Sequence, residues 1–390
     1  MTQGAEAGPM LPSPPRPTPQ AWIALLGRAS GAPADGVEDY CAQLRDAFLE
    51  KGVPFEMLRM PLAERSWRSA LAWLRERLAA HDPAVVLLQY NALSWSRRGF
   101  SVGALLVLRT LKRHTSRVGV IFHDAGPYPG TRLRDRIRRR VQIWVMRRLI
   151  KNSAKSICAL PADCLPWFPS AYVKNKFALI PIGSGMAQIS GAAAPALKPT
   201  TKKDLRIAVF GLGLNNIADL SAQLARIVSA AAKNAGPVRL AVFGLGALES
   251  ESALRKSLEG TAVTLEIDGI LGSAEVCERL RQSSVQLFIR SGVSACRSSI
   301  VAGVCCGLPI VGWQDWDTAY PITEAGLRTA PCGDEAGLIR ELASVLTDGT
   351  LRSRLALRSA EAAEKYFSWR TIATKFQDEL CPGVKSATKR

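Results

Sequence analysis

Short apolar runs alternate with segments of helical periodicity from residue 22 onward. In the first half of the chain the runs are WIALLG, AVVLLQY, VGVIF, SICAL and FALIP, which begin at residues 22, 84, 118, 156 and 177. The segments between them, such as 37–51 and 67–78, repeat apolar residues every three or four positions, as amphipathic helices do. Strands that alternate with helices in this way predict a parallel sheet covered by helices on both faces.

The alternation stops after Pro181 and begins again at Leu205. Residues 183–204 are rich in Gly, Ala, Pro and Lys and show no periodicity, which is typical of an interdomain linker. The runs that follow are LRIAVFG, VRLAVFG, AVTLEI, VQLFI and LPIVG, again separated by helical patterns. The fold class that we predict is therefore α/β, with two tandem Rossmann-like domains, each a doubly wound parallel sheet.

These patterns divide the chain into successive parts. We expect an N-terminal domain over residues 21–185, a linker over 186–204 and a C-terminal domain over 205–364, followed by a last helix over 365–382. Residues 1–20 carry six prolines and lack the apolar core of a signal peptide, so we expect a disordered tail there. Residues 383–390 form a short basic tail.

The composition excludes several classes of protein. With 390 residues, of which 47% are apolar and 22% charged, the chain suits two globular domains. No apolar run reaches the ~20 residues that span a bilayer. The nine cysteines are scattered without metal-ligand spacing, and only three histidines accompany them. We therefore expect no metal site, and a reducing compartment such as the cytoplasm.

The net charge of +18 is concentrated in one segment. Residues 131–155 contain ten basic residues and one acidic residue, and they predict an amphipathic helix from Arg132 to Lys155 with one apolar stripe and a cationic remainder. The stripe consists of Leu133, Ile137, Val141, Trp144 and Val145.

Such a helix suits nucleic acid, anionic lipid or a phosphorylated substrate as partner, unless it is only the solvated face of a core helix. The chain has no zinc-finger spacing and no aromatic side chains interleaved with the basic ones. We therefore expect an anionic membrane surface to be the partner of the Arg132–Lys155 helix, and no nucleic acid.

Glycine-rich loops follow two runs of the second half. FGLGLNN begins at residue 210 and FGLGALE at residue 243. Each starts like the dinucleotide-binding GxGxxG motif but has Asn216 or Glu249 in place of the third glycine. A tight strand-to-helix turn explains these glycines as well as a ligand does. No GKS or GKT sequence follows, so an ATPase P-loop is absent.

The stretch RSGVSACRSSIVAGVCCGLPIVG, residues 290–312, runs from a strand through a small-residue turn into a helix and a further strand. It combines Arg290 and Arg297 with several serines and contains no carboxylate. The turn is therefore basic and rich in hydroxyl groups, and it holds no side chain that could act as an acid or base.

Taken in order, several segments resemble GT-B glycosyltransferases, and within that class the retaining family-4 enzymes that build bacterial surface polysaccharides. The segments are DGVEDYCAQLRDAFLEKGV (35–53), VVLLQY (85–90), VIFHDAGPYPG (120–130), ALIPIGS (178–184), residues 269–312 and FSWRTIATKF (367–376). The resemblance implies a UDP- or GDP-linked sugar donor in a cleft on the C-terminal domain and an acceptor on the N-terminal domain. It implies transfer with retention, without a cofactor or obligatory metal, and a last helix that returns to the N-terminal domain.

The resemblance also implies roles for individual residues. As catalytic residues it indicates His123 and Asp124. The expected acceptor contacts are Asp35, Gly36 and Glu38. The expected donor contacts are Gly211, Arg290, Ser291, Gly292, Ser294, Arg297, Ser298 and Ser299.

The chain departs from the family pattern at the donor site. Many family-4 enzymes carry two glutamates eight positions apart before a Gly-x-Pro turn, and alignment on residues 307–309 puts Ser294 and Ala302 at those positions. The arginine and lysine that usually follow the first strand of the second domain are also missing from residues 211–219. Neutralisation of the donor phosphates would then fall to Arg290 and Arg297.

We therefore expect a retaining glycosyltransferase that transfers a sugar from a nucleotide-diphosphate donor to a lipid-linked or polysaccharide acceptor in cell-surface glycan biosynthesis. Its expected place is the inner face of the cytoplasmic membrane. One alternative is a catalytically silent GT-B-like protein that binds or scaffolds partners in a polysaccharide assembly complex. Another is a nucleotide-sugar epimerase of similar shape, which would need a set of acid/base carboxylates that the sequence does not reveal.

Overall fold

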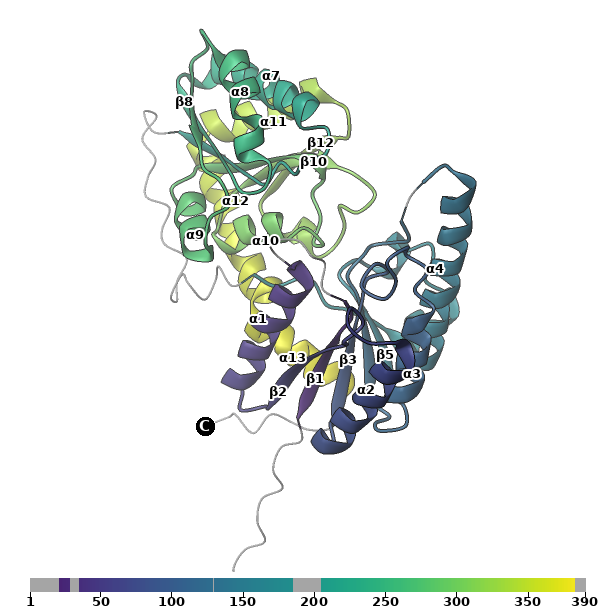
Figure 1. The fold of residues 1–390 in the computed structure, drawn as a ribbon. Coiled ribbons are helices and arrows are strands. Elements are labelled where there is room, and N and C mark those ends of the chain that lie inside the picture. The colour runs from purple at the N-terminus through teal and green to yellow at the C-terminus, as the bar shows by residue number, and fades with distance from the viewer. Residues whose placement is uncertain (1–20, 29–34, 129, 185–204, 383–390) are drawn as a thin grey trace, which may run out of the picture.

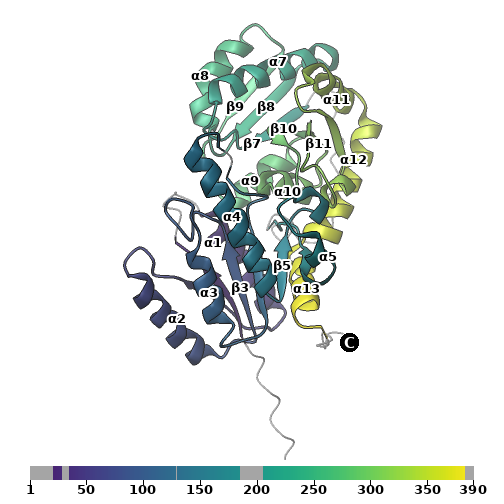
Figure 2. The same cartoon turned by 90° about the vertical axis from the view of Figure 1, so that its right-hand side faces the viewer.

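The computed structural model describes residues 21–28, 35–128, 130–184 and 205–382. The expected N-terminal tail, the linker over 186–204 and the basic C-terminal tail lie outside the described residues. The described chain forms two α/β domains, each built on a six-stranded parallel sheet flanked by helices (Figures 1 and 2). The predicted fold class is confirmed.

The sheet of the N-terminal domain has the order β2-β1-β3-β4-β5-β6. Its strands are β1 (Trp22–Leu26), β2 (Phe55–Arg59), β3 (Val85–Tyr90), β4 (Val118–Phe122), β5 (Lys155–Cys158) and β6 (Phe177–Leu179). Its helices are α1 (Gly36–Glu50), α2 (Trp67–His81), α3 (Gly103–Leu111), α4 (Leu133–Asn152) and α5 (Ser170–Lys176), with a short 3-10 turn, η1 (Ala162–Cys164). Interior strands such as β1 and β4 are buried at every position, so they form continuous apolar runs in the sequence.

The sheet of the C-terminal domain has the order β12-β11-β10-β7-β8-β9. Its strands are β7 (Arg206–Phe210), β8 (Val238–Phe243), β9 (Val263–Ile267), β10 (Val285–Gly292), β11 (Ile310–Gln314) and β12 (Leu327–Pro331). Its helices are α7 (Ile217–Ala235), α8 (Ala247–Leu258), α9 (Ser273–Arg281), α10 (Ser298–Cys305), α11 (Glu335–Thr347) and α12 (Gly349–Ala362), with short turns η2 (Ile322–Glu324) and η3 (Ala363–Phe367). One apolar cluster packs α7, α8 and α11 on one face, and a second packs α9, α10 and η3 on the other.

The last helix, α13 (Trp369–Leu380), belongs to the N-terminal domain, as the family resemblance implied (Figure 1). Its buried residues join the apolar cluster formed by α1 and one face of the first sheet. The Trp369 ring lies 5.2 Å from the Tyr40 ring, and Trp369 Nε1 donates to Gln43 Oε1 at 2.6 Å. The polypeptide therefore crosses between the domains a second time and ties them together.

The basic helix differs from the prediction in its bounds and its buried face. Helix α4 ends at Asn152, and Lys155 begins β5, where it pairs with Glu379 of α13 at 2.6 Å. The residues that α4 buries are Gln142, Val145, Met146, Leu149 and Ile150. Of the expected apolar stripe, Leu133, Ile137 and Trp144 are instead 72%, 48% and 47% exposed.

Leu133 and Ile137 are exposed because only the second half of α4 lies against the core. Trp144 is in that second half, but it lies on the side of the helix opposite the buried residues. The first half extends past the sheet, as Figure 1 shows, and every residue from 130 to 134 is exposed. A stripe read from spacing alone cannot show which part of a long helix has a neighbour to pack against.

Candidate functional site

The strand order reverses once in each sheet, and these reversals mark where ligands bind in such folds. The reversal lies between β1 and β3 in the first sheet and between β7 and β10 in the second. At such a point the loops at the carboxyl ends of two adjacent strands run to opposite faces and leave a crevice. The turn after β10 also reaches the other domain, because Cys296 packs against the core cluster of the N-terminal domain.

A cavity of about 730 Å³ lies at the reversal point of the second sheet. That volume is in the usual range for small-molecule sites. Its walls come from the loop after β7, the start of α7, the loop after β8 and the end of β10. They consist of Leu212, Gly213, Leu214, Asn215, Asn216, Asp219, Leu220, Gln223, Arg226, Leu245 and Arg290.

The two glycine-rich loops form one wall by packing against each other. A Cβ on Gly246 would lie 2.1 Å from the carbonyl oxygen of Gly213, and both residues have positive φ. Gly211 also has positive φ and donates its N–H to the carbonyl of Phe243 at 2.9 Å, but it does not line the cavity. The glycines therefore shape a turn, and the cavity is a consequence of that turn.

Arg290 lies at the rim of this cavity because β10 is irregular. The pairing of β10 with β11 shifts register between Phe288 and Gly292, and such a bulge re-aims the side chains within it. The guanidinium of Arg290 stands 5.5 Å from the centre of the Phe288 ring and forms no ion pair within the described residues. Partial burial and the nearby Arg297 both lower the pKa of Arg290. A bound anion would relieve this repulsion.

The remaining predicted donor residues lie in the turn between β10 and α10. Ser294 is buried, and its Oγ accepts from the N–H of Cys296 at 3.3 Å. Ser291 is half-buried, Ser298 is exposed, and the buried hydroxyl of Ser299 has no hydrogen-bond partner within the described chain. Arg297 occupies the N-cap position of α10. The structure thus brings Arg290, Arg297 and the first amides of α10 into one region, which favours an anion.

The sequence reasoning missed a carboxylate in this region. Asp317, in the loop after β11, lies 3.4 Å from Arg297, and its side chain is only 3% exposed. A Cβ on Gly292 would come within 2.6 Å of Asp317 Oδ1, so glycine is needed there for close approach. Burial raises the pKa of Asp317, and the charge of Arg297 opposes that rise. The signal was present in QDWD (314–317), two acidic residues directly after β11, which is the strand next to β10.

His123 follows β4 and is held by its neighbours. Its Nε2 lies 2.8 Å from Gln89 Oε1, and its ring meets the Tyr40 ring edge-on at 5.2 Å. Because Gln89 Nε2 donates to the carbonyl of Leu87, the Oε1 atom faces His123 and accepts the proton of Nε2. Burial lowers the pKa of His123 to about 4, although Asp35 opposes the shift. The imidazole is therefore neutral at neutral pH, with Nδ1 as its unprotonated nitrogen.

Asp124, the next residue, is the carboxylate of the site best suited to proton exchange. Its Oδ1 accepts from Asn91 Nδ2 at 3.2 Å, and burial raises its pKa to about 6. Its charge also contributes to the raised pKa of Cys296, so Asp124 lies near the turn after β10 of the other domain. A carboxylate with a pKa near working pH serves as an acid or a base.

The predicted acceptor residues lie at the start of α1. Asp35 is the N-cap, and its Oδ1 accepts from the N–H groups of Val37 and Glu38 at 3.1 and 3.4 Å. Arg59 pairs with both Asp35 and Glu38. A Cβ on Gly36 would meet nothing within 4 Å. These residues cap and neutralise a helix start, and acceptor binding by them stays a prediction.

Two further properties bear on the expected chemistry. Across the residues that the structure describes, no three or more His, Cys, Asp or Glu side chains are grouped so as to hold a metal ion. Within the same ranges, no helix combines the length and the apolar character that crossing a bilayer requires.

Comparison with known proteins identifies the fold. Sucrose-phosphate synthase from Thermosynechococcus elongatus superposes with a TM-score of 0.60 at 15% identity, over 92% of this chain and 98% of that chain. Anabaena HepE, solved with UDP and glucose, superposes with a TM-score of 0.59 at 13% identity, over 93% and 99% of the two chains. A protein provisionally described as a UDP-N-acetylglucosamine 2-epimerase from Listeria monocytogenes superposes with a TM-score of 0.56 at 14% identity, over 92% of this chain and 96% of that chain.

No protein-family model matches the chain, and no curated protein sequence is similar to it. The two-domain GT-B fold implied by the resemblance is confirmed. At identities of 13–15% these matches establish the fold alone.

Proposed function

We propose that this protein is a glycosyltransferase that uses a nucleoside-diphosphate sugar. The observation that carries the proposal is the rim of the cavity at the second reversal point, where Arg290 has no carboxylate partner within the described residues and lies close to Arg297. The leaving group of such a transfer is a nucleoside diphosphate, so the site must stabilise developing charge on phosphate oxygens. Two arginines and the amides of a helix start supply that stabilisation.

The N-terminal domain contributes the polar groups that would face the sugars. Asp124 is mostly ionised at neutral pH because its pKa is about 6, so it can accept a proton or hydrogen bond from a sugar hydroxyl. The neutral ring of His123 offers Nδ1 as a further acceptor, since Nε2 is directed at Gln89. We assign these two residues to the reacting end of the donor and the acceptor.

The finer proposal is a retaining transfer from a UDP- or GDP-linked sugar to a lipid-linked or polysaccharide acceptor in surface glycan synthesis. It rests on the family resemblance, and the solved structure of HepE with UDP and glucose is in accord with a UDP-linked donor. We place the protein at the inner face of the cytoplasmic membrane because α4 is strongly cationic.

A second candidate is a GT-B-like protein that binds a nucleotide or a partner without turnover. Ser294 and Ala302 stand where family-4 enzymes commonly have glutamates, and both are buried. The epimerase alternative is supported by the match to the Listeria monocytogenes protein. Transfer of the sugar to an added acceptor separates a transferase from both alternatives, because a silent protein turns over no donor and an epimerase converts the donor without an acceptor.

The first test of the proposal is nucleotide binding. UDP, GDP and their hexose conjugates are titrated by calorimetry into the wild type and into Arg290→Ala, Arg297→Ala and Arg340→Ala; Arg340 lies on α11, away from the cavity. We expect one nucleotide class to bind, with affinity reduced roughly tenfold to a hundredfold in the first two variants and unchanged in the third. Wild type that binds no nucleotide, or arginine variants that bind normally, would refute the proposal.

A further inference from the structure

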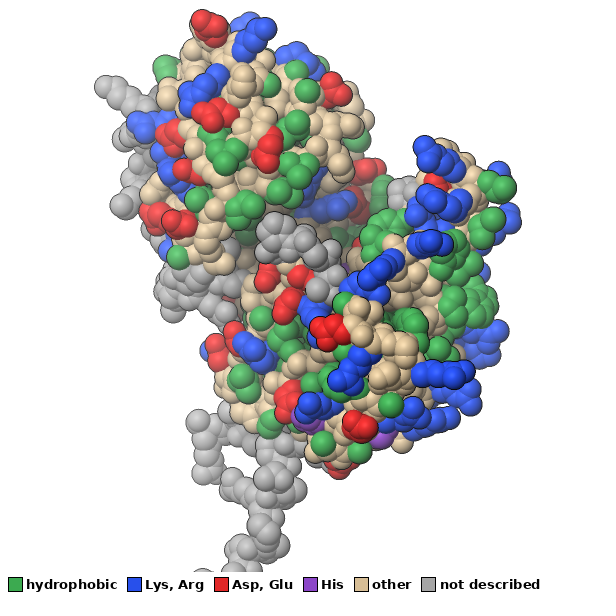
Figure 3. Space-filling model, in the orientation of Figure 1, with side chains coloured by type: hydrophobic (Ala, Val, Ile, Leu, Met, Phe, Trp, Pro, Cys, Tyr) green, Lys and Arg blue, Asp and Glu red, His purple; other side chains and the backbone are tan. Residues whose placement is uncertain are grey.

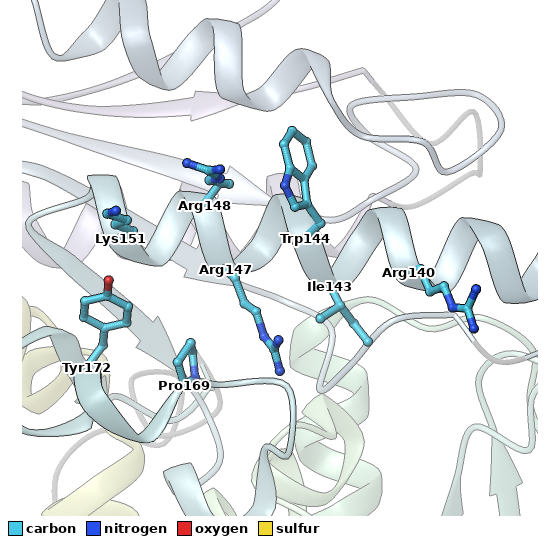
Figure 4. A pocket seen from close by; sticks show the side chains of 8 residues that line it. All are labelled: Arg140, Ile143, Trp144, Arg147, Arg148, Lys151, Pro169 and Tyr172. Atoms are coloured by element: carbon cyan, nitrogen blue, oxygen red, sulfur yellow. The ribbon is translucent and has the colours of Figure 1, made fainter.

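A second cavity, of about 520 Å³, lies on the outside of the N-terminal domain between α4 and α5 (Figure 4). It is separate from the reversal points of both sheets, since its walls come from the middle and end of α4 and from the start of α5. Its cationic residues are Arg140, Arg147, Arg148 and Lys151. None of the described residues that line it is a carboxylate.

No acidic residue in the described part of the chain neutralises the positive charge of this groove. Helix α4 contains one acidic residue, Asp135, and that residue pairs with Arg138 at 3.0 Å. Within the described part of the chain, none of the four cations of the groove forms an ion pair. A concentration of like charge raises the local potential and attracts anions. Figure 3 shows the result as a band of Lys and Arg along the flank that α4 forms.

The geometry of the groove prepares it for a phosphate. Arg147 donates from Nε to the carbonyl of Trp167 at 3.2 Å, which fixes the side chain and leaves its two terminal nitrogens available. Figure 4 shows its guanidinium reaching across the groove beside Pro169. Arg148 lies over the ring of Trp144, 5.8 Å from its centre, and is ordered by that contact. Pre-ordered guanidinium groups lose less entropy when they bind a phosphate.

The outer side of α4 adds an apolar component. Leu133, Ile137 and Trp144 follow each other at spacings of four and seven residues, so they share one side of the helix, and all three are exposed. A tryptophan flanked by arginine and lysine is typical of helices that lie in the headgroup region of a bilayer, where the indole sits at the interface. Neither a free phosphate nor a soluble phosphorylated ligand would require this exposed apolar stripe.

We propose that the groove between α4 and α5 binds the phosphate of an anionic phospholipid, so that the outer side of α4 docks on the bilayer with Trp144 in the headgroup layer. The biological purpose of this docking rests on the proposed function, because a lipid-linked acceptor is embedded in a membrane and the protein must reach it there. Its physical basis is independent of that function. The partner is fixed by charge complementarity and by the exposed apolar residues.

The experiment is flotation of the full chain with vesicles of phosphatidylcholine, alone or mixed with phosphatidylglycerol. We expect binding only to the mixed vesicles, weakening with salt. The combined substitution Arg140→Gln, Arg148→Gln and Lys151→Gln should reduce binding about a hundredfold, because each basic residue near an anionic surface contributes roughly fivefold. Arg147 is left in place because it also bonds to the backbone.

Helix α2 offers a matched control. Arg77 lies over the Trp73 ring at 5.8 Å, the same distance as in the Arg148 and Trp144 pair. The combined substitution Arg68→Gln, Arg75→Gln and Arg77→Gln removes the same charge from exposed positions and should leave vesicle binding within about twofold. Equal binding by the α4 and α2 variants would overturn the proposal, since it would show that only net charge matters.

Two further measurements complete the test. Vesicles that contain brominated phosphatidylglycerol should quench the tryptophan fluorescence of the wild type. Trp144→Phe should lose most of this quenching, whereas Trp73→Phe should keep it. Protection of the groove by inorganic phosphate, with no vesicle binding, would assign the site to a soluble ligand and overturn the proposal. Nucleotide affinity measured on the same preparations reports on the proposed function separately, because the two cavities share no residue.

Discussion

The guanidinium of Arg297 lies 3.4 Å from the carboxylate of Asp317, although the two residues come from loops after different strands. Arg297 opens α10, and Asp317 follows β11, so the pair fastens the turn of the candidate donor site to the neighbouring strand end. The turn itself contains no carboxylate. Its charge is therefore balanced from outside, by a residue twenty positions later in the chain.

Asp317→Asn should lower the free energy of unfolding by about 1 kcal/mol. This loss is smaller than for a fully buried ion pair because Arg297 is 39% exposed. Urea denaturation measures the change. Asp315→Asn is the control, because Asp315 is exposed and forms no ion pair within the described residues. A similar loss in both variants would mean that the loop, and not the pair, provides the stability.

Arg290→Lys should not restore nucleotide binding that Arg290→Ala removes. A lysine keeps the charge but replaces the planar fork that grips two phosphate oxygens with a single ammonium. We expect an affinity roughly tenfold below wild type, measured by calorimetry with the nucleotide that binds. An affinity equal to wild type would show that the site needs only a positive charge at this rim.

His123 and Asp124 should make opposite contributions to stability as the pH changes. The folded-state pKa of His123 is about 4, below its ordinary 6.5, so its contribution is present above pH 6.5 and is lost as the pH falls toward 4. The folded-state pKa of Asp124 is about 6, above its ordinary 3.8, so its contribution is present below 3.8 and is lost as the pH rises toward 6. In the wild type the two effects largely cancel between these values.

Single variants should expose each effect. In His123→Gln the unfolding free energy should fall as the pH rises from about 4 to 6, and in Asp124→Asn it should rise over the same range, by on the order of 1–3 kcal/mol. Urea denaturation at a series of pH values gives both slopes. Slopes of the same sign in the two variants would contradict the assigned protonation states.

Gly246→Ala should be far more destabilising than Gly260→Ala. Both glycines have positive φ, but a Cβ at Gly246 would lie 2.1 Å from the carbonyl of Gly213, whereas Gly260 has open space around it. Backbone strain in Gly260→Ala should lower the free energy of unfolding by about 1 kcal/mol. Gly246→Ala should lower it by several times that amount. Because Gly213 lines the donor cavity, nucleotide affinity should fall only in Gly246→Ala. Equal stabilities would show that the two loops can separate without cost.

Chelation of divalent metals should leave nucleotide affinity unchanged. In the proposed site Arg290, Arg297 and the amides of α10 take the place of a cation at the diphosphate. Calorimetry with EDTA and with added Mg²⁺ compares the two conditions directly. An affinity that depends on Mg²⁺ would show that these arginines do not suffice.

The sequence by itself determined the features that depend on near neighbours along the chain. Alternating runs predicted both parallel sheets, and the charge of residues 131–155 was visible as composition. The role of His123, which came from the family resemblance, stays a prediction. Periodicity, caps and glycine turns act over a few residues, so they can be read locally.

The tertiary structure decided what depends on packing between distant segments. Only the fold shows that Trp369 bonds to Gln43, which is 326 positions away, and that Asp317 balances Arg297. Likewise, only the fold shows which side of α4 packs on the core, and Trp144 lies on the opposite side, exposed beside the arginines. Which side chains meet across such distances is set by how complete elements pack, and no local pattern of residues records that.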